Sequence, residues 1–364
     1  MQIVVNILVA IVMAYVSFTN YLATEISHWL GTTPDTYLTT EYPAETAPEL
    51  TPLSSDTRLI PDILLRSSAY QQAALGSLGT VRGATTVNPL EALVNIFCTF
   101  TTRDHIRTTT GTGFFVSDDG VILTNAHVAQ YLLLANADQS GNAECTIRTG
   151  NPAITRYQAD LLYLPPAWIT KNANLINVAV PMGTGERDYA LLYITASATS
   201  APLPAHFPAL GIDTEPLPLR SIGSPVVAAG YPAANLRTEG PNTVLVPQRA
   251  GTQISELYTF GSNLADVFSI RGTAVGAEGA SGGPVVNASG EVIGLIVTRG
   301  DDATDGPGSL RAITLSHIDR TITQETGFSL RQNIGGNLPF RAEVFRTTMT
   351  PFLLTLLERE QQRQ

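Results

Sequence analysis

A serine surrounded by small residues is the first feature of this chain that suggests chemistry. Ser281 lies in the stretch GAEGASGGPVVN, residues 276–287, and Gly282 and Gly283 follow it directly. Small neighbours suit a tight turn, because glycine adopts backbone conformations that other residues avoid. They equally suit a nucleophile whose surroundings leave room for a substrate carbonyl. A serine hydroxyl is a weak nucleophile, so the second interpretation requires a base and a group that orients the base.

Histidine is the usual base for such a serine, and the chain has five histidines. His127 lies in LTNAHVA at the end of a strong strand pattern, where an imidazole can be held between two packed units. The others lie after an apolar N-terminal run, in a polar loop, in a proline-rich connector and before a C-terminal helix; they are His28, His105, His206 and His317. His127 is therefore the candidate base, and a buried structural histidine is the alternative.

Two aspartates have the context expected of the orienting group. Asp188 in ERDYALLYI directly precedes an apolar strand pattern, and Asp160 in QADLLYL has a similar setting. Aspartate is also a common turn residue at the start of a strand. Asp188 is the first candidate and Asp160 the second.

Short strands must position these residues, because many brief apolar runs alternate with glycine- and proline-rich turns. The first set comprises LVNIFCTF, GTGFFVSDDGVILTNAHV, CTIRTG, ADLLYL, INVAV and ALLYI. The second comprises SPVVAAGYP, NTVLVPQRAGTQIS, FSIRG, GGPVVN, EVIGLIVTR and residues 310–315. We expect an all-β fold of two packed six-stranded antiparallel barrels, which occupy residues 88–200 and 220–328 and are joined by the connector 201–219.

The remaining segments flank the barrels. Short helices are expected over residues 63–75 and 318–326. In the tail, residues 329–364, Thr350 suits a helix cap and Pro351 the first helical position. The tail's apolar face comprises Phe352, Leu353, Leu356 and Leu357. This face is expected to pack against the barrels, with an oligomer contact as the alternative.

The N-terminus predicts a membrane segment within residues 1–24. Residues 3–22, IVVNILVAIVMAYVSFTNYL, carry no charge, and a spanning helix needs ~20 mostly apolar residues. An uncleaved anchor is favoured over a secretory signal, because a basic n-region and a clear cleavage site are missing. Residues 25–87 form a linker rich in proline and threonine, typical of an extended spacer that contains the short helix.

Composition narrows the function classes. The net charge is −10 and no Lys/Arg cluster occurs, which argues against nucleic acid as a partner. The two cysteines, Cys98 and Cys145, fit no zinc or redox spacing, and no metal or cofactor is expected. They are either two buried thiols or one disulfide, which would require an oxidising compartment.

The stretches TGTGFFVSDDGVILTNAHV, RDYALLYI and GASGGPVVNASGEVIGLIV together resemble the trypsin-like, chymotrypsin-fold serine proteases. The resemblance covers residues 88–328 and is strongest to the bacterial branch that includes the HtrA/Deg and V8-type enzymes. It implies that His127 is the general base, Asp188 its orienter and Ser281 the nucleophile. Asp188 matches because the family places its aspartate two residues before the Ala-Leu-Leu-like strand.

The same resemblance implies further site residues. The backbone N–H groups of Gly279 and Ser281 match the donors of the oxyanion hole. The substrate pocket is expected to involve Val275, Ala277, Thr298 and Arg299. These residues predict an apolar P1 side chain of small or medium size, whereas Arg299 would instead favour an acidic one.

Departures from the family pattern carry information as well. Ala280 stands where the digestive enzymes have an aspartate that pairs with a new N-terminus, so activation by that insertion is excluded. The segment after residue 328 is too short for a PDZ domain. In the barrel topology that the resemblance implies, Cys98 falls in the first strand and Cys145 near the start of the neighbouring fourth strand, so one disulfide and two free thiols both remain open.

The sequence thus predicts a serine endopeptidase that acts on proteins or peptides. It is expected to be membrane-anchored with the protease part outside the cytoplasm, in the periplasm or at the cell surface, or secreted if the N-terminal segment is cleaved. The alternative is a catalytically silent pseudoprotease that serves as an envelope binding module.

Overall fold

A computed structural model of the chain describes residues 61–76, 83–101, 106–134, 142–173 and 185–362. The predicted membrane segment, most of the linker and the predicted strand INVAV lie outside these residues. Within them, no helix combines the length and the apolar character that a membrane span requires.

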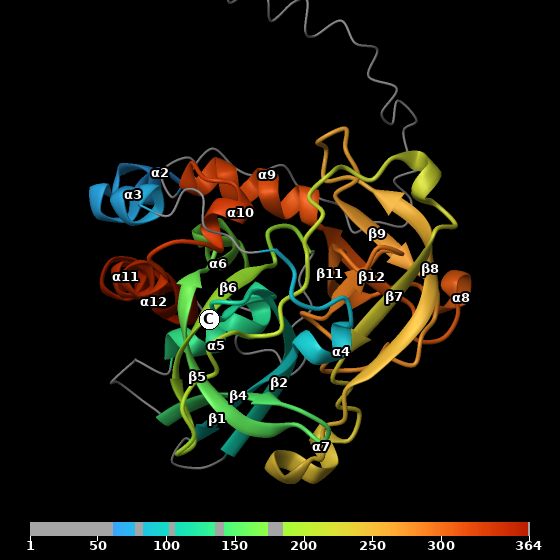
Figure 1. Cartoon of the computed structure of the whole chain (residues 1–364), viewed down its shortest axis with the longest axis horizontal. Coiled ribbons are helices and arrows are strands. Elements are labelled where there is room, and N and C mark those ends of the chain that lie inside the picture. Colours follow the sequence, from blue (N-terminus) through green and yellow to red (C-terminus); the bar gives the residue numbers. More distant parts are fainter. Residues whose placement is uncertain (1–60, 77–82, 102–105, 135–141, 174–184, 363–364) are drawn as a thin grey trace, which may run out of the picture. The chain divides into compact units, whose positions relative to one another are not determined.

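The described strands close into two antiparallel barrels (Figure 1). The first has the order β1-β2-β3-β6-β5-β4 and the second the order β10-β11-β12-β9-β8-β7, so the prediction of two six-stranded barrels is confirmed. The first barrel comprises β1 Leu93–Thr101, β2 Ile106–Ser117, β3 Val121–Thr124, β4 Asn142–Thr149, β5 Ile154–Tyr163 and β6 Ala190–Ser197. The second comprises β7 Pro225–Gly230, β8 Gln248–Tyr258, β9 Val267–Ile270, β10 Pro284–Val286, β11 Val292–Arg299 and β12 Leu310–Thr314.

The connector binds to both barrels on its way between them. In the first barrel, Phe207 N donates to Asp118 O at 2.9 Å, and the Phe207 ring lies 4.7 Å from that of Phe115. In the second, Asp213 N donates to Val292 O at 2.9 Å. The proline-rich connector is therefore an ordered segment that packs along both barrels.

Helices lie around the barrels and between their strands. They are α2 Pro61–Arg66, α3 Ser68–Leu75, α4 Pro89–Ala92, α5 Ala126–Leu134, α6 Pro166–Asn172, α7 Leu236–Glu239, α8 Asp302–Asp305, α9 Leu315–Thr326, α10 Leu330–Asn333, α11 Leu338–Val344 and α12 Thr350–Gln362, with 3₁₀ turns at Leu219–Ser221 and Gly240–Asn242. The helix expected over residues 63–75 is divided at Ser67, whose hydroxyl accepts from Tyr70 N and caps α3.

The tail is helical, as expected, but Thr350 is not a cap. A π-helical turn, Phe345–Met349, joins α11 to α12, so Thr350 lies inside one long helix. The wide turn comes directly before Pro351, a residue that has no N–H to donate to the preceding turn. Leu353 and Leu357 are buried, and α12 packs against α5 and α6 of the first barrel. The expected packing of the tail on the barrels is therefore present, and Phe352 and Leu356 are half-buried beside it.

Helix α9 connects the two barrels. It starts directly after β12, and the Thr314 hydroxyl caps it by accepting from His317 N at 3.1 Å. Its first half lies on the second barrel, and Thr321 and Glu325 on its second half reach residues of the first (Figure 1). Gly327, with a φ of +81°, ends the helix in the left-handed conformation that glycine tolerates.

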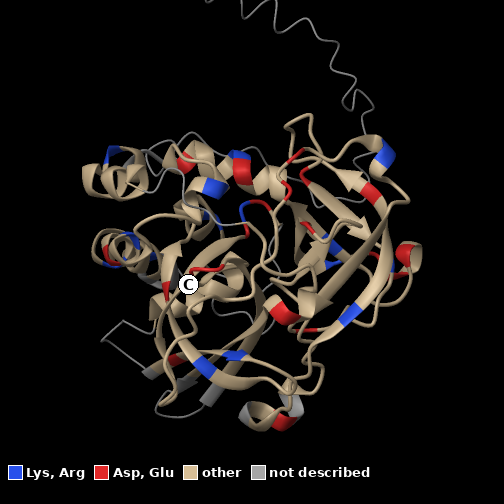
Figure 2. Cartoon of the chain, in the orientation of Figure 1, with Lys and Arg blue, Asp and Glu red and all other residues tan. Residues whose placement is uncertain are grey.

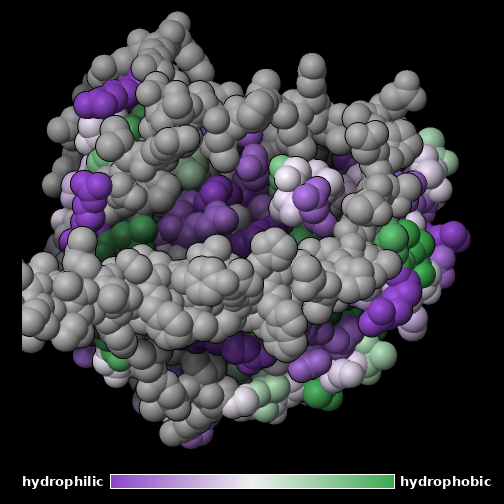
Figure 3. Space-filling view, turned by 90° about the horizontal axis from the view of Figure 1, so that it is seen from above, coloured by the Kyte–Doolittle hydropathy of each residue, from purple (hydrophilic) through white to green (hydrophobic). Residues whose placement is uncertain are grey.

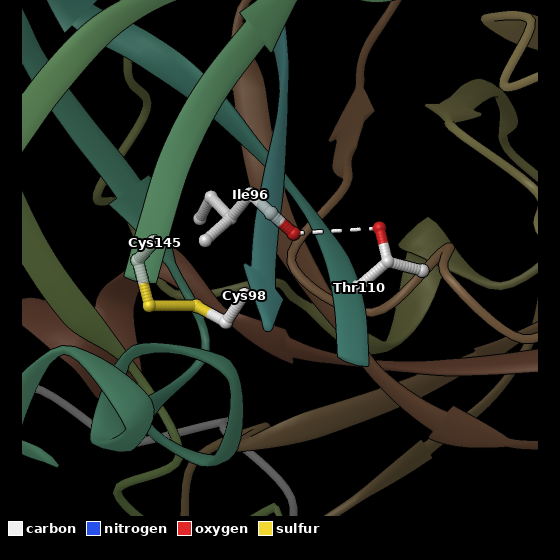
Figure 4. Close-up of a disulfide and its surroundings, with 4 residues drawn as sticks. All are labelled: Ile96, Cys98, Thr110 and Cys145. Carbon is white, nitrogen blue, oxygen red and sulfur yellow. Dashed lines mark hydrogen bonds between the residues drawn. A yellow bond between two sulfur atoms is a disulfide. The ribbon is translucent and has the colours of Figure 1, made fainter. Parts of the chain in front are cut away.

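A disulfide joins Cys98 of β1 to Cys145 of β4 (Figure 4). The two residues are direct partners in the antiparallel register, with their Cα atoms 4.1 Å apart. The disulfide therefore cross-links β1 and β4, the two strands whose pairing closes the first barrel.

Removing this disulfide is expected to lower the free energy of unfolding by about 2–4 kcal/mol, because the bond closes a long loop in the unfolded chain. The sequence separation it spans is 47 residues. The test is urea denaturation of the C98S/C145S double variant and of wild type with and without dithiothreitol. The reductant should shift wild type to the midpoint of the double variant and leave that variant unchanged; equal midpoints for oxidised wild type and the variant would contradict the expectation.

Charged and apolar side chains are both dispersed on the visible surface. In the view of Figure 2, the Lys and Arg residues of the described part are spread over many helices and strands. Figure 3 shows hydrophobic side chains in small separate groups among hydrophilic ones on the coloured part of that face. Isolated exposed apolar residues of this kind are ordinary for a folded domain.

Candidate active site

His127 is held by both oxygens of one carboxylate. Its ring Nδ1 lies 2.7 Å from Asp188 Oδ2, and its backbone N donates to Asp188 Oδ1 at 2.9 Å. Both side chains are buried, with 4% of His127 and 0% of Asp188 exposed. Because an ionised carboxylate only accepts, Nδ1 carries the hydrogen of this contact, and in the neutral imidazole Nε2 is then the nitrogen with the lone pair. The arrangement leaves Nε2 able to accept a proton.

His127 lies in the first turn of α5, two residues after Asn125, rather than at the end of a strand. Strand β3 ends at Thr124, and its four residues are buried. Asn125 follows, and its side-chain amide donates to Asp188 O at 2.8 Å. The start of α5 thus fixes the backbone of Asp188 as well as its carboxylate.

The second candidate, Asp160, does not take part in this arrangement. It lies on β5 and lines a small cavity with Arg346 and Thr350. Burial raises the pKa of the Asp160 carboxyl, while the charge of Arg346 acts in the opposite direction. Of the two aspartates, the structure therefore pairs Asp188 with His127.

Ser281 lies in a turn of the second barrel, and the first barrel holds this turn by hydrogen bonds. Thr112 of β2 makes two bonds to this turn: its N donates to Ser281 O at 2.8 Å, and its hydroxyl donates to Gly279 O at 2.6 Å. The same hydroxyl accepts from Tyr231 N at 2.9 Å. Thr112 is a site residue that the sequence analysis missed, although it lies in the quoted TGTG motif.

The glycines around Ser281 are required by close packing. Gly282 has a φ of +87°, and a Cβ atom there would lie 1.9 Å from Thr112 O and 2.6 Å from Thr124 Oγ1. Thr124 in turn donates to Thr112 O at 2.7 Å and lies three residues before His127. The turn that contains Ser281 thus packs directly against β2 and β3, the two strands that precede His127.

In the described part of the chain, the structure gives no hydrogen bond between Ser281 Oγ and the His127 ring. Such bonds are often long in substrate-free enzymes and shorten when substrate binds. The half-buried position of Ser281 leaves its hydroxyl reachable from solvent.

Two backbone N–H groups of this turn make no hydrogen bond within the described part of the chain. The N–H groups of Ala280, Gly282 and Gly283 donate to Ala277 O, Ile296 O and Ala280 O. Among the described residues, no acceptor is found for those of Gly279 and Ser281. Ala233 N donates to Glu278 O at 2.6 Å, so in the trans peptide that follows the N–H of Gly279 points the opposite way. These two donors are available to an oxyanion.

The predicted pocket residues lie in two segments near the turn. Val275 is fully buried against Gly230, so its side chain offers no open surface in this conformation. Ala277 and Thr298 are half-buried, and Arg299 at the end of β11 is exposed. Arg299 is therefore the most accessible of the predicted pocket residues. In the described residues, no cluster of three or more His, Cys, Asp or Glu side chains has the geometry of a metal site.

A second buried Asp–His pair lies at the start of α9. His317 Nδ1 is 3.0 Å from Asp266 Oδ1, and Arg320 contacts the same oxygen. Ser262 Oγ donates to Asp266 Oδ2 at 2.7 Å. Burial alone would raise the pKa of Asp266, but the hydrogen bond and charge of His317 and the bonds from Ser262 and Phe260 N lower it to about 2.

This cluster predicts a loss of stability in acid. A carboxyl whose pKa is lowered in the folded state stabilises it above the unfolded pKa, and that contribution disappears as the pH falls toward the folded pKa. Between pH 6 and pH 2 the contribution of Asp266 should fall by about 2 kcal/mol. Urea denaturation of wild type and of Asp266→Asn should therefore give free energies that converge by this amount at low pH. A constant difference would contradict the prediction, and Asp119→Asn at an exposed position serves as the control.

Comparisons with known proteins find similarity to peptidases. The trypsin-like peptidase domain family matches residues 111–295. Serine protease HTRA1 of Xenopus tropicalis is 30% identical over 185 residues, which are 51% of this chain and 30% of that protein. Serine protease HTRA1A of Danio rerio is 29% identical over 250 residues, 67% of this chain and 40% of that protein. The chain thus spans less than half the length of these curated relatives.

Among solved structures, the active form of the Rv3671c protease from M. tuberculosis is similar to this chain at 20% identity. The match has a TM-score of 0.39 and covers 66% of this chain and 83% of that one.

Proposed function

Because the chain belongs to the trypsin-like peptidase family, we propose that it is a serine endopeptidase that cleaves peptide bonds through an acyl-enzyme. The observation that carries the proposal is the double hydrogen bond between Asp188 and His127, beside the turn that presents Ser281. A histidine that is held in one tautomer and one orientation is what a serine nucleophile needs.

In the first half of the reaction, Ser281 Oγ attacks the peptide carbonyl and His127 Nε2 takes its proton. The buried carboxylate of Asp188 stabilises the imidazolium that forms. The N–H groups of Gly279 and Ser281 donate to the oxyanion, and the loss of one such donor typically raises the barrier by about 3–4 kcal/mol.

In the second half, the imidazolium gives its proton to the leaving amine, which departs and leaves an ester on Ser281. His127 Nε2 then takes a proton from a water molecule whose oxygen attacks the ester carbonyl. As the ester C–O bond breaks, the imidazolium gives this proton to Ser281 Oγ, which releases the acid and regenerates both residues. Every proton transfer passes through Nε2, so the reaction requires His127 to keep its orientation throughout.

The substrates are proteins or peptides with a small or medium apolar P1 residue. The buried Val275 and half-buried Ala277 support this preference, because neither carries a charge that would pair with a basic side chain. The exposed Arg299 supports the competing preference for an acidic residue. A peptide library with varied P1 residues, hydrolysed by the full chain, separates the two.

The protease part works outside the cytoplasm, with residues 3–22 as its membrane anchor. The Cys98–Cys145 disulfide supports an oxidising compartment such as the periplasm or cell surface. Release by cleavage of the N-terminal segment would make the enzyme a secreted one. Detection of residues 3–22 in the membrane fraction, by mass spectrometry of cells that produce the full chain, tests the anchor.

Labelling with a fluorophosphonate probe tests the proposed activity. The full chain in detergent should form an adduct on Ser281, located by mass spectrometry, and the reaction should be lost in Ser281→Ala and strongly slowed in His127→Ala. A folded wild-type protein that forms no adduct would favour the silent binding module instead. The Asp188–His127 pair and the available N–H groups of the turn support an active enzyme over a silent binding module.

A further inference from the structure

The residues on both sides of Asp188 are held by α9, although α9 follows the second barrel. Arg187 precedes Asp188 and forms an ion pair with Glu325. Tyr189 follows it, and its hydroxyl lies 2.8 Å from Thr321 Oγ1. Thr321 and Glu325 are four residues apart on α9 and therefore share one helix face. One face of α9 thus contacts the residues on both sides of Asp188.

Glu325 is the centre of this contact. Its side chain is 1% exposed and that of Arg187 is 14% exposed. The second carboxylate oxygen of Glu325 accepts from Tyr163 Oη of β5 at 2.6 Å. The Tyr163 ring stacks on that of Tyr189 with centroids 6.0 Å apart. The buried charges are therefore paired with one another and hydrogen-bonded to the first barrel.

Arg187 and Glu325 each favour the charged form of the other, against the effect of burial. Burial raises the pKa of Glu325, and the charge of Arg187 opposes that rise. Burial would lower the pKa of Arg187, but the charge of Glu325 together with smaller contributions from Tyr189, Tyr163 and Glu186 outweighs burial and raises the pKa above its usual value. Each charge thus stabilises the other in a place that water hardly reaches.

The backbone at Arg187 requires such support. Its φ is +57°, and among the described residues only Arg187 and Asn263 have a positive φ without being glycine. A side chain in this region is strained and persists only where its surroundings enforce it. Arg187 O accepts from Tyr189 N at 2.9 Å, and Asp188 N donates to Gly185 O at 3.1 Å, so the conformation of Arg187 sets the direction of Asp188.

We propose that Arg187 and Glu325 are positioning residues: their buried ion pair holds the left-handed backbone that aims the Asp188 carboxylate at His127. The inference rests on the proposed function, because it assigns these residues a part in the same reaction. It also gives α9 a role in catalysis, since the helix transmits support from the second barrel to the orienting group of the first.

The test compares kcat, KM and stability among Glu325→Gln, the double variant R187M/E325Q and a matched control. Glu325→Gln leaves Arg187 buried without its counter-charge and is expected to be less stable as well as slower. The double variant removes both charges, and removal of a whole buried pair often restores stability. Gln324→Ala is the control, because Gln324 accepts only a long 3.4 Å bond from Arg187 at the exposed side.

The double variant decides the question. It should unfold at a urea concentration close to that of wild type and still show a kcat about 10- to 100-fold lower with an unchanged KM, because a small displacement of the orienting group slows chemistry but not binding. Gln324→Ala should match wild type. A stable double variant with the kcat of wild type would overturn the inference, as would a loss confined to KM.

A double variant that fails to fold is replaced by Tyr189→Phe, which removes only the hydroxyl bound to Thr321 and should lower kcat at least threefold without a change in KM. Equal kcat for that variant and wild type would also overturn the inference. An inactive wild-type protein would instead contradict the proposed function, so the two failures remain distinct.

Discussion

Replacement of Ser281 by alanine is expected to lower kcat for peptide hydrolysis by about 10⁵- to 10⁶-fold. The oxygen of this hydroxyl forms the bond to the acyl group. A water molecule from solvent is a poor substitute, because it is not held in position next to the substrate carbonyl. The turn itself should persist, since the backbone of Ser281 is fixed by Thr112 through a bond to its carbonyl and not through its side chain.

The measurement is turnover of an internally quenched peptide by wild type and by Ser281→Ala, with folding checked by urea denaturation. Ser289→Ala provides the matched control, because Ser289 is exposed in the turn between β10 and β11. The control should keep the activity of wild type. A Ser281→Ala variant that keeps more than a tenth of the wild-type kcat would show that another group attacks the substrate.

Replacement of Asp188 by asparagine is expected to lower kcat by about 10⁴-fold, the size of effect seen when the orienting carboxylate of such a triad is neutralised. The reason lies in the two bonds to His127. One carboxylate oxygen accepts from the backbone N of His127, so an asparagine must keep its only side-chain oxygen there. Its amide NH₂ then faces Nδ1, which must become an acceptor. The hydrogen moves to Nε2, and the ring can no longer take the proton of Ser281.

Asp160→Asn is the control for this change, because Asp160 was the second candidate for the orienting group and lies inside β5, with no bond to His127 among the described residues. It should retain the kcat of wild type within a factor of about three. Steady-state kinetics on the same peptide measure both variants. A smaller loss for Asp188→Asn than for Asp160→Asn would reverse the assignment of the two residues.

The parts of the fold that follow from local pattern could be predicted from the sequence. Alternating apolar runs and turn residues gave two sets of strands, and the structure closes them into two barrels. The small residues around Ser281 indicated a crowded turn, and Gly282 has no room for a side chain. Asp188 was preferred to Asp160 by its resemblance to the family, and the structure places it against His127.

The parts that depend on contacts between distant segments could not be predicted. The Thr112 hydroxyl of the first barrel donates to Gly279 O in the turn of the second barrel, and these two residues are 167 positions apart in the sequence. Glu325 and Arg187 are 138 positions apart, and a glutamate on an amphipathic helix usually faces solvent. The helical start of the segment that carries His127 was also missed, although Asn125 directly before α5 is a residue type that favours a helix start; its side-chain amide donates to the distant Asp188 O.

Observation of an acyl-enzyme tests the proposed chemistry most directly. The full chain is mixed with an activated ester of a small apolar amino acid, quenched in acid during turnover and digested for mass spectrometry. We predict an acyl group on the peptide that contains Ser281, together with a burst of product equal to the enzyme concentration in wild type and no burst in Ser281→Ala. Turnover without an acylated Ser281, or an acyl group on another residue, would contradict the assignment of Ser281 as the nucleophile.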